Sequence, residues 1–498
     1  MSITSEQNRN HGRQRSNCSS TSRRMPPVAS NGKALAGVAN LHGRMPNMRI
    51  PFHEALVAFG RTSAQHVLDA EAPLSLEAPL SLEAPLSLEA PQTPLAEKCS
   101  PNTAKIVCIN GYSAVMPGNF YRAPPPASIN PMDQPSYAQT KIPSDPSWGQ
   151  AEDADFIVYD KERGLEILGN EPTSDFAFEI MPLFHDATVY DPYTNEVYFS
   201  QLSGGEISQK VIDLNGNEPR LLRKKANPPL YSPTGGIYRN GLFYYCVGGS
   251  SHAVPGPDGT VARPGIYTLN ATSGESKVLL NNYLGTCNDI AMDGEGNIWF
   301  TDDDYSFGNG VSAHHPILSP AVWRFNPKTG SVRIVDNHLK QPNGIAFSPD
   351  FKTLYVADSG AETVPDHPPA VGHVINNPYN VTDPRVVWAF DWLPDGLRVA
   401  DNGYVLVGVG DGIDILSPEG DLLLKIQTKF TSVGNTWAGK DSKDIWITGV
   451  GGIQKVHLNL PGGKSLGDGE TEPEEGQKWL QETAAGSHQY CWLAFLFL

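Results

Sequence analysis

Oxygen-bearing side chains recur at one position of a repeated sequence pattern, and together they could bind a metal ion. Each is the second residue of one copy of the pattern, and the six are Asp186, Thr234, Asn288, Asn343, Asp395 and Asn435. Carboxylates and amides that face one shared space repel or stay unpaired unless a cation or ordered water neutralises them. Because hard cations prefer oxygen ligands, the pattern indicates one divalent cation, with Ca²⁺ first and Mg²⁺, Mn²⁺ or Zn²⁺ as alternatives. Any single one of these residues also suits an ordinary turn before a strand.

The elements that must position these residues are hairpins. Each copy runs from a polar residue through an apolar strand and a turn to a second strand around Tyr or Trp, and the copies span residues 185–200, 233–245, 287–301, 342–356, 394–407 and 434–447. Further strands with Gly-containing turns follow several copies, at 265–274, 321–330 and 412–420. This repeat predicts an all-β fold, a six-bladed β-propeller of four-stranded blades, in which the starts of the innermost strands meet at one end of a central channel.

The chain divides into three parts by composition. Residues 1–103 contain a basic head and a repeated Glu-Ala-Pro-Leu-Ser-Leu tract, whose regular prolines oppose helix and strand, so we expect a disordered extension. Residues 104–460 hold the predicted propeller, and residues 461–498 form an irregular tail rich in Gly and Glu. The 48 glycines and 42 prolines exclude a helical bundle or a coiled coil.

Charge and apolar patterning exclude several classes of partner. The net charge of −17 combines a basic head (residues 1–50, eight Lys/Arg and one acid) with an acidic body (29 Lys/Arg and 53 acids), and this acidic body argues against nucleic acid. No apolar run reaches the roughly 20 residues of a membrane span. No secretory signal is evident, so we expect a cytoplasmic protein, with mitochondrial import and secretion left open. The six cysteines have no zinc-like spacing, which predicts reduced thiols and no thiolate metal site. No oligomeric state is favoured.

Three motifs resemble the senescence marker protein, gluconolactonase and luciferin-regenerating enzyme family, in particular its fungal lactonohydrolase branch. They are Asn288-Asp-Ile-Ala-Met-Asp-Gly-Glu-Gly-Asn-Ile-Trp-Phe-Thr-Asp302, the segment 342–350 with 354–358, and Pro394-Asp395-Gly396. The resemblance covers roughly residues 105–460. It implies a six-bladed propeller with one catalytic divalent cation and hydrolysis of a small lactone, either of sugar type or from secondary metabolism.

The resemblance also implies roles for individual residues. Asn343 and Asp395 match metal ligands, and Asn288 matches the asparagine that lies beside the metal and contacts substrate. Asp186 stands where the family normally has a glutamate ligand, so it keeps the charge but has a shorter reach. A second departure follows Asp391, where too few residues precede Pro394 for another strand, so we expect the fourth blade to be one strand short.

Opening a lactone requires a polarised carbonyl and an activated water, and one cation can supply both. We expect Asp186, Asn343 and Asp395 to hold the cation with Asn288 beside it, and Asn288 to orient or polarise the substrate carbonyl. Asp395 or a nearby histidine would take the proton of the water, and His185 would contact substrate. The sequence contains no Gly-x-Ser-x-Gly elbow for a serine nucleophile.

Two other functions stay open on the residues alone. A related propeller activity, such as ester or organophosphate hydrolysis or a strictosidine-synthase-like condensation, would use the same ring of oxygens. Asp186 in place of glutamate and a short fourth blade would also fit a protein that has lost catalysis and serves as a binding scaffold. Long connections at 249–264, 303–320 and 359–385 predict a lopsided lid over the site.

Overall fold

Antiparallel hairpins follow one another along the chain and make up nearly all of its regular structure. The computed structural model describes residues 93–99, 105–110, 142, 145–252, 262–281, 284–360, 371–376, 383–389 and 394–463, with backbone alone for the two ranges between 371 and 389. Within these residues strands far outnumber helices, which confirms the predicted all-β class. None of their helices is long and apolar enough to cross a membrane.

Four of the six sheets in the described part of the chain are formed by consecutive strands. The first contains β5 (Val189–Asp191), β6 (Glu196–Phe199), β7 (Ser208–Asp213) and β8 (Arg220–Lys225). The second contains β9 (Pro233–Arg239), β10 (Leu242–Val247), β11 (Gly265–Leu269) and β12 (Ser276–Leu280). The third contains β13 (Ile290–Met292), β14 (Ile298–Asp302), β15 (Ala321–Asn326) and β16 (Ser331–Asp336). The fourth contains β17 (Pro342–Phe347), β18 (Thr353–Asp358), β19 (Val371–Asn376) and β20 (Asp383–Ala389).

The other two sheets include strands from the N-terminal side of the first sheet. The fifth contains β21 (Leu397–Val399), β22 (Val405–Val409), β23 (Gly412–Leu416) and β24 (Leu422–Gln427), extended by β3 (Phe156–Val158), β2 (Ile106–Ile109) and β1 (Ala96–Lys98). The sixth contains β25 (Ser432–Ala438), β26 (Asp444–Gly449) and β27 (Gly452–His457), completed by β4 (Thr173–Glu179). The pairing of β4 with β27 therefore joins the beginning of this region to its end.

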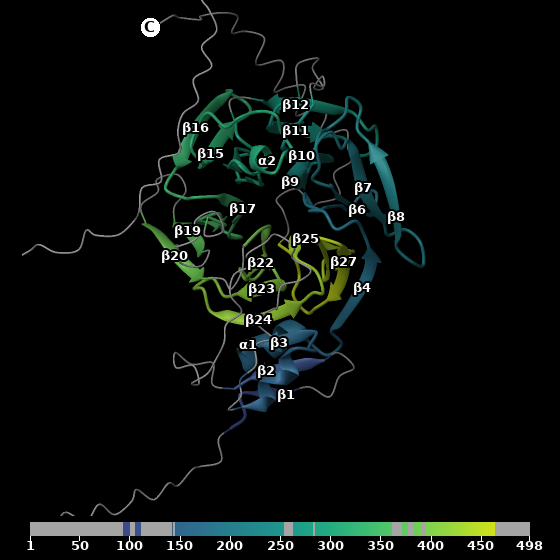
Figure 1. Cartoon of the computed structure of the whole chain (residues 1–498), viewed down its shortest axis with the longest axis vertical. Coiled ribbons are helices and arrows are strands. Elements are labelled where there is room, and N and C mark those ends of the chain that lie inside the picture. The colour runs from purple at the N-terminus through teal and green to yellow at the C-terminus, as the bar shows by residue number, and fades with distance from the viewer. Residues whose placement is uncertain are drawn as a thin grey trace, which may run out of the picture. The chain divides into compact units, whose positions relative to one another are not determined.

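The first strands of neighbouring sheets contact one another in chain order. Contacts run from β5 and β9 through β13, β17 and β21 to β25, and β25 in turn contacts β5. Figure 1 shows the sheets following one another in this order. The starts of the first strands, where the sequence places its recurring polar residues, are thereby brought near one another.

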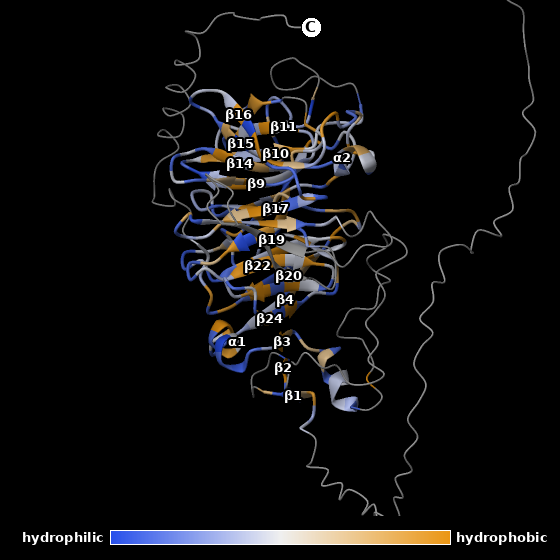
Figure 2. Ribbon diagram, turned by 90° about the vertical axis from the view of Figure 1, so that its left-hand side faces the viewer, coloured by the Kyte–Doolittle hydropathy of each residue, from blue (hydrophilic) through white to orange (hydrophobic). Residues whose placement is uncertain are grey.

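Local sequence explains how the hairpins turn. Asn240 and Gly241 form a two-residue turn between β9 and β10, with Arg239 paired to Leu242. Both turn residues have positive φ, 52° and 79°, as the tight turns favoured in hairpins require. Figure 2 shows the result, with hydrophobic colour concentrated on the strands and hydrophilic colour on the connecting loops.

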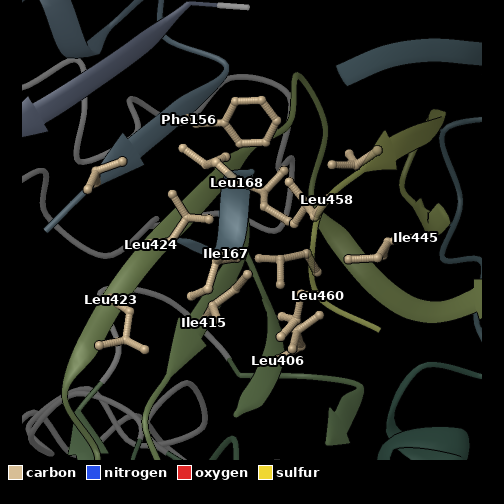
Figure 3. Packing of buried hydrophobic residues seen from close by; sticks show 14 of the residues in the cluster. Phe156, Ile167, Leu168, Leu406, Ile415, Leu423, Leu424, Ile445, Leu458 and Leu460 are labelled. Atoms are coloured by element: carbon tan, nitrogen blue, oxygen red, sulfur yellow. The ribbon is translucent and has the colours of Figure 1, made fainter. Parts of the chain in front are cut away.

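Short helices occur between the strands. They are η3 (Pro146–Ala151), α1 (Lys161–Leu168) and α2 (Tyr305–Gly308). Of these, α1 contacts β24 and β3. In α1, the Asp160 side chain caps the N-terminus by accepting the Arg163 N–H at 2.9 Å. Figure 3 shows Leu168 of α1 packed with Phe156 of β3 and Leu424 of β24, in a buried apolar cluster.

Side-chain hydroxyl groups form hydrogen bonds between adjacent sheets at five places in the described chain. Each donates a hydrogen bond to a backbone carbonyl where the first strand of the following sheet begins: Ser200 to Pro233, Thr234 to Cys287 (2.6 Å), Thr301 to Asn343 (2.7 Å), Ser359 to Pro394 (2.6 Å) and Thr448 to His185 (3.1 Å). These carbonyls belong to the recurring polar residues or to their immediate neighbours. The backbone at these positions is therefore fixed from the adjacent sheet.

The glycines of the Asn-Gly and Asp-Gly pairs have a different role from that of turn residues. Gly344 and Gly396 are absent from the positive-φ glycines of the described chain, so no left-handed turn requires them. A Cβ on Gly344 would lie 2.6 Å from Leu397 N, and a Cβ on Gly396 would lie 2.6 Å from Val433 O. Both glycines are required because the first strand of the next sheet approaches so closely.

Two expectations from the sequence were wrong. The fourth sheet has four strands, because β20 occupies the segment before Asp391 and pairs with β19. The cysteines are not all reduced thiols: Cys99 is bonded to Cys108, and Cys246 to Cys287. Sequence spacing gave no signal for the second bond, since 41 residues separate its partners. Disulfides of this kind are typical of oxidising compartments.

Several expectations fall on residues that lie outside the described chain. They concern the basic head and the hexapeptide tract, the tail after residue 463, and the parts of the predicted lid at 253–261, 361–370 and 377–382. Strand β1 lies within the range 1–103, for which the sequence predicted disorder.

Replacing Gly344 with Ala tests the close approach of neighbouring first strands. The new methyl group would overlap the backbone of β21 and of the residues just before it. We therefore expect G344A to lower the free energy of unfolding by about 1–3 kcal/mol, measured by urea denaturation. Gly149→Ala is the matched control, since a Cβ there meets nothing within 4 Å. Equal stability of the two variants would contradict the proposed packing.

Candidate functional site

Asp186 is held at the entry to β5. Its backbone exchanges hydrogen bonds with Ser200, with Ser200 N donating to Asp186 O at 2.8 Å. Its Oδ1 accepts the N–H of Ala187 at 2.8 Å, and Ala187 adopts a left-handed conformation with φ of 53°. Burial, and then the nearby carboxylate of Asp289, raise the pKa of Asp186 to about 8. The site therefore places a carboxyl group where its charge is poorly compensated.

Asn288 lies directly after the disulfide-bonded Cys287. Its Nδ2 donates to Asp303 Oδ2 at 2.6 Å, while its backbone N–H donates to Thr301 O at 2.8 Å. Its Oδ1 is buried and has no hydrogen-bond partner among the described residues. An unpaired buried acceptor is costly and marks a place where a ligand, an ion or water could bind.

Asn343 is the second residue of β17, and Asp395 comes two residues before β21. Asn343 Nδ2 lies 3.2 Å from Ser359 Oγ, and the backbone N–H of Asp395 donates to Gly408 O at 2.9 Å. Both side chains are buried. Together with Asp186 and Asn288 they lie at the starts of first strands, as the sequence predicted, in four different sheets.

Two members of the predicted ring lie differently. The Thr234 hydroxyl donates to Cys287 O and so anchors the backbone at the start of the next sheet. Asn435 pairs with Ile447 inside β25, one residue beyond Gly434, whose Cβ position faces Asp186 and Thr188 of the next sheet. Gly434 thus has the place of Gly344 and Gly396, and the residue before it is Val433, which has no side-chain oxygen.

His185 is buried beside Asp186 and oriented by two carbonyl groups. Its Nδ1 lies 2.7 Å from Leu183 O and 3.1 Å from Gly449 O. Because carbonyls only accept, Nδ1 must carry the proton, which leaves Nε2 as the acceptor nitrogen. Burial lowers the pKa of His185, so the ring is neutral near pH 7.

Three charged residues that the sequence did not single out complete the site. Arg398 Nη1 donates to Asp289 Oδ2 at 3.2 Å, and its Nη2 donates to Gly236 O on β9 at 3.2 Å. The guanidinium thus reaches from β21 to two other sheets. Burial raises the pKa of Asp289 and also that of Asp303, the latter to about 7. One signal was present: Asp289 directly follows Asn288, and Asp303 lies in a run of three aspartates.

Two further buried aspartates, Asp302 and Asp358, accept hydrogen bonds from backbone N–H groups. Asp302 Oδ1 accepts the N–H groups of residues 285, 286 and 287 at 2.8, 3.0 and 3.3 Å. Asp358 accepts those of residues 340, 341 and 360 at 3.1, 2.8 and 3.1 Å. Each aspartate ends a second strand and holds the turn that enters the first strand of its own sheet.

The described part of the predicted lid is anchored to several sheets. Ser306 N–H donates to Thr286 Oγ1 at 3.0 Å, and Ala313 N–H donates to Ser250 O at 3.0 Å. Gln341 Nε2 donates to Asp304 Oδ1 at 2.8 Å. Residues 303–316 therefore cross the starts of β13 and β17 and hold Asp303 in place.

The donor set fits a hard divalent cation. Asp186 and Asp395 offer carboxylate oxygens and Asn288 and Asn343 offer amide oxygens, of which Asn288 Oδ1 is buried and unpaired. Among the described residues no three His, Cys, Asp or Glu side chains gather in a metal-binding arrangement. The predicted set differs from such a cluster because half of its ligands are amides.

Comparison with known proteins identifies similar chains. A family model described as "SMP-30/Gluconolactonase/LRE-like region" matches residues 186–451. Lactonohydrolase oryL of Aspergillus oryzae is 36% identical over 395 residues, covering 74% of this chain and 89% of its own. Lactonohydrolase oryH of the same organism is 34% identical over 448 residues, covering 74% and 94%. A solved gluconolactonase of Xanthomonas campestris has a TM-score of 0.50 at 22% identity, covering 61% of this chain and 96% of its own, and is similar in fold.

The charge of Asp186 predicts a pH-dependent stability for the chelator-treated protein. Its carboxyl loses a proton near pH 4 when unfolded and near pH 8 when folded, so the free energy of unfolding falls as pH rises between these values. Asp186→Asn removes the titrating group, and with it this fall in the free energy of unfolding, while keeping the oxygen that accepts the Ala187 N–H. We expect D186N to be more stable than the wild type at pH 8 by about 1–3 kcal/mol, with a smaller difference at pH 5, in thermal unfolding.

Asp350→Asn is the control for this experiment. Hydrogen bonds from Ser348 and Lys352 lower the pKa of Asp350 to about 2, so removing its charge should give no gain at pH 8. A D186N protein that is less stable than the wild type at pH 8 would contradict the account of an uncompensated buried charge.

Proposed function

Because the chain belongs to the SMP-30/gluconolactonase/LRE-like family, we propose that it hydrolyses the ring ester of a small lactone with the help of one divalent cation. The observation that carries the proposal is the set of oxygens from Asp186, Asn288, Asn343 and Asp395. All four lie in the matched region 186–451, at the starts of first strands, and Asn288 Oδ1 is buried without a partner in the described chain. The lactonohydrolases of Aspergillus oryzae support the choice of a lactone. We propose a lactone of sugar type or from secondary metabolism.

The proposed architecture is a six-bladed propeller. Each of the six sheets would be one blade, with β5, β9, β13, β17, β21 and β25 lining the centre. The succession of contacts between these strands and the contact between β25 and β5 support this arrangement. The pairing of β4 with β27 supplies the strand that completes the sixth blade.

Asp186, Asn343 and Asp395 would hold the cation, and Asn288 would lie beside it. Ca²⁺ is the first candidate, since the donors are all oxygen atoms. When bound, such a cation polarises a carbonyl and lowers the pKa of a water molecule. The raised pKa values of Asp186, Asp289 and Asp303 support a functional role, because buried carboxyl groups with raised pKa values are concentrated at functional sites.

The residues of the chain would bind the substrate and move one proton. Asp395 is the proposed acceptor of the proton released by water, and His185 is the second candidate. With its Nδ1 hydrogen bonded to two carbonyls, His185 presents Nε2 as an acceptor, which suits a substrate hydroxyl group. Asp289 and Arg398 form an ion pair within the same cluster and hold β13 to β21.

A pH-stat assay with γ- and δ-lactones tests the proposal. We expect the wild-type protein to release acid, and chelator or Asp395→Ala to lower the rate by about 100-fold or more, since both remove stabilisation of the reacting oxygens. Asp350→Ala, an exposed turn carboxylate, is the control and should retain full activity.

Two outcomes would contradict the proposal in different ways. Hydrolysis that survives both chelation and D395A would exclude the metal-dependent mechanism while leaving the lactone as substrate. A well-folded wild-type protein that hydrolyses no lactone and binds no cation would favour the scaffold.

A further inference from the structure

We propose that Asp303 and Ser359 are positioning residues that turn the amide oxygens of Asn288 and Asn343 toward the site. The inference rests on the proposed function only in treating these two asparagines as members of the site. It concerns which atom of each amide is available to a ligand. An amide can present either its NH₂ group, which donates to acceptor atoms, or its oxygen, which binds donors and cations.

Asp303 determines the orientation of Asn288. Above its pKa of about 7 the Asp303 side chain is an ionised carboxylate, which can only accept, so the amide atom 2.6 Å from Asp303 Oδ2 is then the Asn288 nitrogen. The Asn288 oxygen then points elsewhere, and it is the buried oxygen that has no partner among the described residues. Asn288 is therefore presented to the site as an acceptor.

Asp303 is itself immobilised by its surroundings. Its Oδ1 accepts the backbone N–H of Tyr305 at 2.9 Å, and the Thr286 side chain forms a further hydrogen bond to the carboxylate. Thr286 Oγ1 in turn accepts the N–H of Ser306 at 3.0 Å. The described lid segment thus holds the carboxylate that orients Asn288.

The backbone of Asn288 is fixed independently. Cys287 is bonded to Cys246 on β10, and its carbonyl accepts the Thr234 hydroxyl at 2.6 Å. The Asn288 N–H donates to Thr301 O. With both the main chain and the NH₂ group held, rotation of the amide has little freedom left.

Ser359 has the corresponding role in the next sheet. Its hydroxyl donates to Pro394 O at 2.6 Å, so its single hydrogen is already used. The Asn343 atom 3.2 Å from Ser359 Oγ must therefore be the donor Nδ2, which leaves Asn343 Oδ1 as the outward atom. Asp303 follows Asp302, and Ser359 follows Asp358, so both positioning residues come directly after the aspartate that ends a second strand.

This arrangement changes the role expected for Asn288. An amide whose NH₂ group is committed to Asp303 suits a cation, a water molecule or a substrate hydroxyl better than a substrate carbonyl, because carbonyls need a donor. Two oriented amide oxygens together with two carboxylates form an acceptor-only set. Such a set selects divalent cations of hard character.

Hydrogen exchange of the side-chain amides tests the orientation without any need for activity. In protein labelled with ¹⁵N-asparagine, the Nδ2 signal of Asn288 is identified by its loss in Asn288→Ala. We expect Asp303→Leu, which removes the acceptor, to speed exchange of the Asn288 Nδ2 protons by about tenfold or more. Asp303→Asn keeps an acceptor oxygen and should restore much of the protection.

The matched control is Asp293→Asn, which alters another buried aspartate of the third sheet, at its opposite end. Asp293 accepts from Asn297 and Trp299 and directly follows the last residue of β13, whereas Asn288 precedes the first. This variant should leave the Asn288 signal unchanged even if it lowers stability. Unchanged exchange at Asn288 in a folded D303L protein would overturn the proposal.

A double-mutant cycle links the orientation to the site. We expect D303L to weaken Ca²⁺ binding by about tenfold in calorimetric titration, and to have little further effect when Asn288 is already alanine. Equal effects of D303L with and without Asn288 would show that Asp303 acts by another route and would overturn the proposal. Failure of the wild type to bind Ca²⁺ would contradict the proposed metal dependence, while the exchange experiment would still decide the orientation.

Discussion

Hydrogen bonds between neighbouring sheets fix the starts of five of the six first strands in the described chain, and the site depends on these fixed points. A hydroxyl at or just past the end of one strand donates to a carbonyl of the next sheet, as Thr301 does to Asn343 and Ser359 to Pro394. Gly344 and Gly396 allow the backbones to approach closely enough for this contact. The side chains next to these bonds have little freedom to move apart, so the fold cannot reduce the repulsion between their charges by separating them.

The electrostatic consequence is an excess of buried acid. Asp186, Asp289 and Asp303 all have raised pKa values, with burial as the largest cause, and Arg398 compensates one of them directly. A fold that keeps such groups without a ligand loses stability whenever they ionise. A divalent cation would relieve this repulsion and also accept the oxygen lone pairs that Asp303 and Ser359 leave facing the site.

The sequence predicted those parts of the molecule that depend on local pattern. Alternating apolar residues and turn dipeptides indicated the hairpins, and the residues at the starts of the first strands included Asp186, Asn288, Asn343 and Asp395. Local pattern could not identify Arg398, because its partners Asp289 and Gly236 lie in other sheets. It could not identify Asp303, because this residue meets Asn288 across 15 residues of one hairpin. The register of Asn435 was misjudged, since Gly434 rather than Asn435 aligns with the close-approach glycines. Neither the Cys246–Cys287 bond nor the β4–β27 pairing had a sequence signal, because both join segments distant in the chain.

The central claim is that one cation binds among the oxygens at the starts of the first strands. A crystal structure of the protein grown with Ca²⁺, with anomalous data to identify the ion, tests it most directly. The account predicts a single strong peak within about 2.3–2.6 Å of oxygens from Asp186, Asn343 and Asp395, with the oxygen of Asn288 facing it. A map with no peak among these residues at saturating Ca²⁺, or with the Asn288 NH₂ group turned toward the ion, would contradict the account.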